Sequence, residues 1–494
     1  MSSNLVKATF WITISEIIFN ISGFIIHAVV GQILGPADYG RYGLVVTLTT
    51  MVIILIGNGI PTAMAKYLSE IFETKVNLIK VIKRQAMILQ SLIIGSITVI
   101  FFLAAPLIAK ILGDPTLTPL FRISTLIIPA FAAASFYFSY FTGLHQFNIQ
   151  STLKVSRSIL KIIFIISLTY FWRVEGSIAG YIIAPAVVFL IAFFIDKLFV
   201  DKKIKSEASK STLAPSDIKF DWKKLVNYAW QIVIFFLAYE LLISIDLYLV
   251  KGILHSDYET GIYNASITIG RIPYYLFYAL TVILLPVISK TTSQNMKEET
   301  FKVISQSLRL MVVLLVPSVI LMSIYAKETI TLFFSNKYID SAYPMSILVW
   351  GVGFLTIYYI LCFIMSGAEK VKKPMIVSII ALIINTILNY ILIKKYGIVG
   401  SAIATSIASA FAAIIMLYYI WKDFEVVLHY KTIFKIALAG VIIYFISPLL
   451  PTGKIIFILS SVILFAFYLL LLYILGEITK KDLAFLRKSI IKSK

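Results

Sequence analysis

Long apolar stretches recur along this chain, each bounded by charged residues or by glycine and proline. A helix needs about 20 mostly apolar residues to cross the hydrocarbon core of a bilayer. Fourteen stretches are of this kind: residues 9–33, 43–66, 85–108, 117–143, 155–172, 177–199, 225–250, 261–288, 303–325, 342–366, 374–393, 398–421, 432–450 and 455–476. The pattern predicts an all-α polytopic membrane protein with about 14 transmembrane helices.

The composition supports this prediction and excludes several other classes of protein. Hydrophobic residues make up 60% of the 494 positions and charged residues 14%, whereas soluble domains have about 45–50% and 25%. A large soluble catalytic domain and a disordered chain are therefore excluded. The one cysteine, Cys362, excludes a disulfide scaffold. The first stretch is too long and too polar for a cleaved signal peptide, so we expect it to be retained as a span.

The net charge of +20 is informative through its position along the chain. With the N-terminus placed in the cytoplasm, 33 of the 44 lysines and arginines fall on the cytoplasmic side. Basic residues are retained on that side of the membrane. We therefore predict a multi-pass protein of the cell (plasma) membrane with both termini cytoplasmic and with membrane lipids around it. The charge then sets orientation, and we expect no nucleic-acid partner.

Short motifs recur at a nearly constant spacing and divide the chain into two similar halves. The pairs are Gly40-Arg41-Tyr42 with Gly261-Ile262-Tyr263, Pro61 with Pro286, Gly143 with Gly367, and Gly176 with Gly400, at offsets of 221, 225, 224 and 224. Six spans separate the members of each pair. The two halves should therefore be related by a pseudo-twofold axis along the membrane normal, a plan that places a substrate cavity between them.

The repeat predicts five regions. These are an N-lobe of spans one to six (1–199), a cytoplasmic linker (200–223), a C-lobe of spans seven to twelve (224–422), two appended spans (423–479) and a basic cytoplasmic tail (480–494).

Several stretches resemble the polysaccharide flippases of the multidrug/oligosaccharidyl-lipid/polysaccharide exporter superfamily. They include ILGPADYGRYGLV, GNGIPTAMAKYLSE, LLPVISK, LFFSNKYIDSAYPMSILVWG and NTILNYILIKKYGIVGSAIATSIAS. The resemblance implies a non-enzymatic transporter that moves a lipid-linked oligosaccharide from the inner to the outer leaflet by alternating access, without a cofactor. H⁺ or Na⁺ is a candidate coupling ion. Lipid II flippases resemble one another in having arginines on the first helix, where this chain has Glu16, Asn20 and His27.

Ionisable and polar side chains within spans are costly unless they face a wet cavity or a partner, so they are the first candidates for a site. Glu16, Asn20 and His27 share one face of span one, at spacings of four and seven. We expect this stripe to line the cavity, with Glu16 as a coupling or gating residue. In the alternative, Glu16 pairs with a lysine and His27 is a packing residue.

Span eight has a polar and aromatic face. Its members, at spacings of 4, 3, 4 and 3, are Asn264, Thr268, Arg271, Tyr275 and Tyr278. An arginine deep in a span suits a diphosphate, which it can bind bidentately, and the tyrosines can stack on sugar rings. In the alternative, Arg271 forms a structural pair with Glu240 or Asp246 of span seven, which are also candidates for coupling or gating.

Span five begins with Lys154, Arg157 and Lys161, at spacings of three and four. This basic stripe is either an anchor at the cytoplasmic surface, with side chains that snorkel, or a first docking site for the diphosphate, in which Arg157 and Lys161 bind substrate.

Three functions follow from these residues. We prefer a flippase for an isoprenoid-diphosphate-linked oligosaccharide. The alternatives are a cation-coupled drug or small-molecule antiporter of the same superfamily, or a flippase for the peptidoglycan precursor lipid II. A membrane glycosyltransferase would need a catalytic carboxylate and a sizeable outer loop, and the outer loops here are short. The sequence contains no P-loop and no zinc-binding motif.

Overall fold

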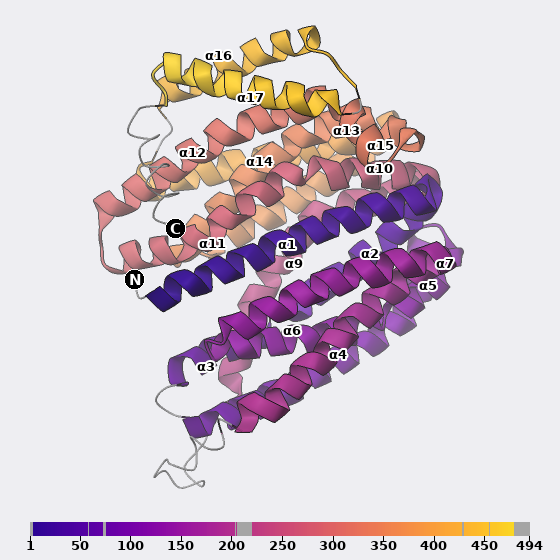
Figure 1. Ribbon diagram of the computed structural model, residues 1–494, viewed down its shortest axis with the longest axis vertical. Helices are drawn as coiled ribbons and strands as arrows, with labels where there is room; N and C mark the ends of the chain where they lie inside the picture. Colours follow the sequence, from indigo (N-terminus) through magenta and orange to yellow (C-terminus); the bar gives the residue numbers. More distant parts are fainter. Residues whose placement is uncertain are drawn as a thin grey trace. The chain divides into compact units, whose positions relative to one another are not determined.

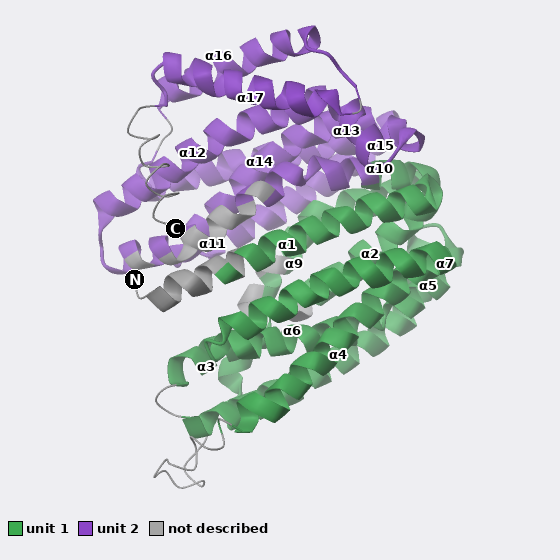
Figure 2. Cartoon of the chain, viewed as in Figure 1, with its two compact units in different colours: residues 1–264 green, residues 265–494 purple. Residues whose placement is uncertain are grey.

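A computed structural model of the chain describes residues 3–57, 59–72, 76–202, 204, 220–426, 429–453 and 455–478. These residues are helical apart from short turns and connections, and no strand occurs among them (Figure 1). The all-α prediction is confirmed. The chain forms two compact units, residues 1–264 and 265–494 (Figure 2).

The first unit contains the helices of the N-terminal half and the one that follows the linker. They are α1 (Ser3–Leu34), α2 (Pro36–Gly57), α3 (Ile60–Ile71), α4 (Val76–Ile111), α5 (Thr118–Ser124), α6 (Ile127–Gly143), α7 (Phe147–Ile195), α9 (Lys223–Leu254) and the first part of α10 (Asp257–Gly270). Helix α9 belongs to this unit because it packs against α2 and α3. The lobe boundary expected at 200–223 stays a prediction.

The second unit contains the remainder of α10 and the helices after it. They are α11 (Ile272–Ser293), α12 (Lys297–Ile324), α13 (Ala326–Phe333), α14 (Ala342–Gly367), α15 (Lys372–Phe424), α16 (Tyr430–Ile446) and α17 (Ile456–Ile474). Helices α14 and α15 pack closely together, and α16 packs against α12 and α17.

Nine helical elements of the described chain are long and apolar enough to cross a membrane. Two of them, Phe147–Val200 and Lys372–Phe424, have 54 and 53 residues, or about 80 Å at 1.5 Å per residue. A bilayer core is about 30 Å thick, so each of these elements is long enough for two spans. Most described residues of each of the fourteen apolar ranges are helical, and the exact number of spans stays a prediction.

Both long elements change direction at equivalent positions of the repeat. Non-helical backbone angles occur at Trp172 and Arg173 in α7 and at Gly397 in α15. Arg173 and Gly397 lie 224 residues apart and have similar angles, with φ/ψ of 47°/−125° and 57°/−141°. The repeat found in the sequence therefore has a counterpart in the backbone of each unit.

Two glycines in these hairpins have the same surroundings. A Cβ atom at Gly176 would lie 1.9 Å from the carbonyl oxygen of Leu168, and one at Gly400 would lie 2.0 Å from that of Leu392. Only a residue without a side chain fits so close an approach of two backbones. In α7 and in α15, the two halves of the element therefore approach each other at an equivalent glycine.

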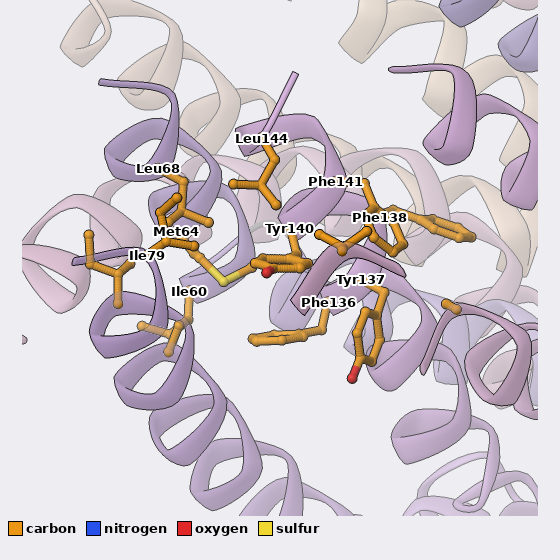
Figure 3. Packing of buried hydrophobic residues seen from close by; sticks show 14 of the residues in the cluster. Ile60, Met64, Leu68, Ile79, Phe136, Tyr137, Phe138, Tyr140, Phe141 and Leu144 are labelled. Atoms are coloured by element: carbon orange, nitrogen blue, oxygen red, sulfur yellow. The ribbon is translucent and has the colours of Figure 1, made fainter. Parts of the chain in front are cut away.

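A buried core in the first unit fixes the position of α6. Met64 and Leu68 of α3 pack with Tyr140 and Phe141 of α6 in one hydrophobic cluster, and Met64 points toward Tyr140 in Figure 3. Phe138 belongs to the same cluster. This packing holds α6 in place beside α7.

Span eight differs from the continuous helix expected over 261–288. The helix is interrupted at Arg271, between α10 and α11. Pro273 follows two residues later, and a proline within a helix removes one hydrogen bond and clashes with the carbonyl four residues before it. The backbone N–H of Arg271 still donates to Ile267 O at 3.1 Å. The stripe of polar residues predicted for this span is therefore divided between two helices.

Candidate functional site

Three basic side chains form a stripe along the first half of α7. Lys154, Arg157 and Lys161 follow one another at spacings of three and four, which places them on one face of the helix. Arg157 is 4% exposed and Lys161 is 7% exposed. Snorkelling at a membrane surface leaves the charged group in water, so burial of these two residues argues against a purely anchoring role.

Helix α1 packs along α7 and contributes a carboxylate to this stripe. Glu16 accepts a hydrogen bond and forms a salt bridge with Lys154 Nζ. The side chain of Lys154 is 12% exposed and that of Glu16 is 25% exposed. The structure therefore favours the lysine-paired state of Glu16 that the sequence analysis left open.

Aromatic rings surround the guanidinium group of Arg157. Its Cζ atom lies 5.3 Å from the ring centroid of Phe19, 4.4 Å from that of Phe131 and 4.6 Å from that of Phe138. Phe131 and Phe138 are two turns apart on α6 and so share a face. Each cation–π contact stabilises a charge by about 0.5–2 kcal/mol, depending on desolvation.

Lys161 has a similar environment. Its Nζ atom lies 4.6 Å from the ring centroid of Tyr181, in the second half of α7, and 5.4 Å from that of Phe19. The hydroxyl of Tyr181 is 3.1 Å from that of Tyr42 on α2, so a second helix holds this ring in place. We call the set Glu16, Phe19, Phe131, Phe138, Lys154, Arg157, Lys161 and Tyr181 the basic–aromatic cluster.

The basic–aromatic cluster contains more positive than negative charge. Within the described part of the chain, Glu16 is the carboxylate that pairs with it, and it contacts Lys154. The Nε and Nη1 atoms of Arg157 are buried and have no hydrogen-bond partner there. Burying a charged group without a hydrogen-bonded counter-charge costs several kcal/mol. An oxyanion with several acceptor oxygens would satisfy these donors.

The other residues expected on the face of α1 lie in different surroundings. Asn20 is half-buried. His27 Nδ1 is 3.0 Å from the hydroxyl of Tyr39, and the His27 ring also contacts Tyr42 edge to face. His27 thus packs between α1 and α2, and the basic–aromatic cluster does not include it. Its role in binding substrate stays a prediction.

The binding and gating roles expected for residues of spans seven and eight also stay predictions. Asp246 is buried and accepts a hydrogen bond from Tyr263 at 2.9 Å, and Glu240 is half-buried. Asn264 is buried, Arg271 and Thr268 are half-buried, and Tyr275 is exposed. Tyr278 lies in α11, and its side chain is outside the described residues.

Sequence reasoning missed the aromatic members of the cluster. Phe19, Phe131, Phe138 and Tyr181 lie in apolar stretches, where aromatic residues are common and give no signal of their own. The seven-residue spacing of Phe131 and Phe138 was the one pattern available. Their contact with Arg157 depends on the packing of α6 against α7.

Comparison with known families identifies the class of protein to which these helices belong. The polysaccharide biosynthesis protein family matches residues 5–292 of the chain, which is more than half of it. The chain belongs to this polysaccharide biosynthesis protein family. The MatE family also matches, over residues 232–391, in keeping with the wider multidrug/oligosaccharidyl-lipid/polysaccharide exporter superfamily.

The chain is similar in sequence or in fold to three known proteins. It is 24% identical over 464 residues to the lipid II flippase MurJ of Bacillus subtilis, covering 84% of this chain and 83% of MurJ. It is 23% identical over 199 residues to the probable low-salt glycan biosynthesis flippase Agl15 of Haloferax volcanii, covering 39% of this chain and 42% of Agl15. A solved structure of a lipid II flippase MurJ in an inward closed conformation is 18% identical, with a TM-score of 0.74 over 94% of this chain and 98% of that one.

These similarities confirm the family predicted from the sequence and the transporter fold. The chain is a multi-pass membrane transporter of this superfamily, and the relatives above are named as flippases.

Proposed function

We propose that this protein is a flippase that moves an isoprenoid-diphosphate-linked oligosaccharide from the inner to the outer leaflet by alternating access. The observation that carries the proposal is the buried guanidinium of Arg157, whose Nε and Nη1 donors have no acceptor in the described chain. Lys161, one turn away, faces aromatic rings and forms no salt bridge with a carboxylate among the described residues. This arrangement suits the anionic diphosphate of a lipid-linked glycan.

The chemistry of the cluster matches the diphosphate better than the other parts of such a substrate. Arginine presents a planar fork of donors that fits phosphate oxygens bidentately, and lysine adds a compact point charge. The aromatic rings exclude water, which strengthens charge–charge interactions at the site. In this proposal Arg157 and Lys161 bind the diphosphate, and Arg271, Asn264, Thr268, Tyr275, Tyr278, Asn20 and His27 contact other parts of the substrate.

The matches to known proteins support a flippase over an antiporter. One relative is named as a lipid II flippase and another as a probable low-salt glycan biosynthesis flippase. The MatE match, which covers residues 232–391, supports the alternative of a cation-coupled antiporter. A cluster with three cations and one carboxylate favours an anionic substrate over a cationic drug.

A substrate panel in liposomes tests the proposal. The full-length protein is reconstituted, and transfer between leaflets is measured for three labelled molecules: an isoprenoid-diphosphate oligosaccharide, lipid II and a cationic dye. We expect transfer of the first and no gradient-driven movement of the dye. Transfer of lipid II alone would replace the substrate with a peptidoglycan precursor. Movement of the dye alone, driven by a proton or sodium gradient, would replace the flippase with an antiporter.

A further inference from the structure

Helix α1 contributes two unlike side chains to the basic–aromatic cluster. Glu16 forms the salt bridge with Lys154. Phe19, one turn later, is the ring that all three cations share: its centroid lies 5.4 Å from Lys154 Nζ, 5.3 Å from Arg157 Cζ and 5.4 Å from Lys161 Nζ. One turn of α1 thus covers the whole basic stripe of α7.

The charges of the cluster are incompletely balanced in this state. Among the described residues, three basic side chains face one carboxylate, and that carboxylate contacts the most exposed of the three. Phe19, Phe131 and Phe138 stabilise the other charges through their ring faces. An aromatic face is a weaker counterpart for a guanidinium than an oxyanion, which accepts hydrogen bonds as well as carrying charge.

An anion that binds Arg157 and Lys161 and also reaches Lys154 therefore competes with α1. Glu16 already occupies Lys154, and Phe19 lies against the same cations that the anion would contact. The Nε and Nη1 donors of Arg157 are buried, so an anion reaches them only when neighbouring side chains move. Because α1 packs along α7, the displacement of Glu16 and Phe19 would remove contacts that hold α1 against α7.

We infer that Glu16 is an internal counter-ion that holds the place of the substrate's diphosphate, and that diphosphate binding displaces it together with Phe19 and releases α1 from α7. The inference rests on the proposed function. It assigns Glu16 a role opposite to that of a substrate ligand, because its carboxylate occupies Lys154, next to the two cations that would bind the diphosphate. Substrate binding would then be coupled to a change in the packing of α1 against α7.

The test is a binding measurement on the purified full-length protein in lipid nanodiscs, with inorganic pyrophosphate as the probe at fixed ionic strength. Glu16→Gln removes the competing charge and keeps the shape of the side chain. We expect it to tighten pyrophosphate binding about tenfold, equivalent to about 1.4 kcal/mol. Glu175→Gln is the matched control, because Glu175 is an exposed glutamate elsewhere on α7, and we expect no change in affinity.

A second measurement uses the wild-type protein and does not depend on a variant that folds. Hydrogen–deuterium exchange of peptides from residues 14–34 is compared with and without pyrophosphate. We expect exchange in α1 to rise on binding, since Glu16 and Phe19 leave α7. A ligand that only added contacts to a fixed α1 would lower exchange there or leave it unchanged, and this result would overturn the inference.

The outcomes separate this inference from the proposed function. Binding that Arg157→Gln weakens, but that Glu16→Gln weakens or leaves unchanged, would retain the anion site and overturn the role of Glu16. Pyrophosphate binding that Arg157→Gln does not affect would remove the anion site itself, and the proposed function would lose its main support.

Discussion

Gly40 on α2 and Gly261 on α10 are in backbone contact, although 221 residues separate them in the sequence. A Cβ atom at Gly40 would lie 2.3 Å from Asp257 O and 2.7 Å from Gly261 N. A Cβ atom at Gly261 would lie 1.8 Å from Pro36 O. These glycines occupy equivalent positions in the two halves of the chain, so the repeat brings its own two copies together here.

Replacement of Gly261 with alanine should separate α2 from α10. No side chain fits at 1.8 Å from a carbonyl oxygen, and the clash is with backbone that cannot rotate away. Overpacking of this kind costs about 1–3 kcal/mol. We expect Gly261→Ala to lower the apparent melting temperature of the purified protein. Gly23→Ala is the control, because a Cβ there meets no atom within 4 Å. A Gly261→Ala protein as stable as the control would contradict the contact.

Lys251 at the end of α9 joins two other parts of the first unit. Its Nζ atom is 3.0 Å from Asp114 Oδ2 and 2.5 Å from Asp257 Oδ1, and the side chain is 2% exposed. Removing one partner of a buried ion pair leaves an uncompensated charge and costs about 3–5 kcal/mol. We expect Lys251→Met to destabilise the protein strongly in a thermal unfolding assay.

A compensating variant separates this charge effect from lost packing. Lys251→Met combined with Asp114→Asn and Asp257→Asn leaves no unpaired carboxylate, so it should recover most of the lost stability. Lys110→Met is the control, because Lys110 is exposed near the end of α4. A triple variant no more stable than Lys251→Met would show that packing of the lysine stem, rather than its charge, carries the effect.

The stability of this region should also depend on pH through Asp114. Burial raises the pKa of Asp114, but the hydrogen bonds from Thr116 and Lys251 and the charge of Lys251 outweigh it, so the pKa lies below its ordinary value. A lowered folded-state pKa stabilises the protein above the unfolded-state value of about 3.9. That stability is lost as pH falls through the folded-state pKa.

The measurement is the melting temperature as a function of pH in the acid range. We expect it to fall less steeply with decreasing pH in Asp114→Asn than in the wild type, because the amide has no proton to take up. Glu298→Gln, at an exposed position at the start of α12, should follow the wild type. Equal slopes for wild type and Asp114→Asn would show that Asp114 does not contribute.

The turn in α15 should require glycine more strictly than the equivalent turn in α7. Gly397 has a positive φ of 57° and no atom within 4 Å of an added Cβ, so any cost of Gly397→Ala comes from the backbone alone. Such strain costs about 1–3 kcal/mol. Arg173 adopts similar angles and is held by hydrogen bonds to Asp38 Oδ2 at 2.9 and 2.7 Å and to Leu34 O at 3.0 Å.

We therefore expect Gly397→Ala to lower the melting temperature, whereas Arg173→Gly should leave it nearly unchanged. In the second variant the relief of strain offsets the loss of exposed polar contacts, which contribute about 0–1 kcal/mol. A large loss of stability in Arg173→Gly would mean that the contacts with Asp38 and Leu34 determine this turn.

The sequence predicted the helices and the repeat because both depend on local patterns. Apolar length defines a membrane helix, and Gly176 and Gly400 mark equivalent close approaches in the two halves. The interruption at Arg271 was missed although Pro273 was visible, because the polar residues continued at helical spacing across it. A pattern of side chains does not show where the backbone hydrogen bonds are interrupted.

The site was predicted in part. The spacing of Lys154, Arg157 and Lys161 gave the basic stripe, and the pairing of Glu16 with a lysine was one of two alternatives. The enclosure of Arg157 by Phe131 and Phe138 was not predictable. It results from the packing of α6 against α7, and contacts between separate helices leave no periodic signal in the sequence.

The central claim is that a buried cation on α7 binds the anionic headgroup of the substrate. It is tested most directly by the rate at which a labelled isoprenoid-diphosphate oligosaccharide moves between the leaflets of liposomes that contain the full-length protein. The variants are Arg157→Gln and, as the control, Arg122→Gln, an exposed arginine that also lies over a phenylalanine ring, 5.2 Å from Phe102.

Loss of charged hydrogen bonds to the diphosphate should slow transfer by Arg157→Gln about tenfold or more. Arg122→Gln should transfer the substrate at the wild-type rate. Transfer at the wild-type rate by a folded Arg157→Gln protein would contradict the account.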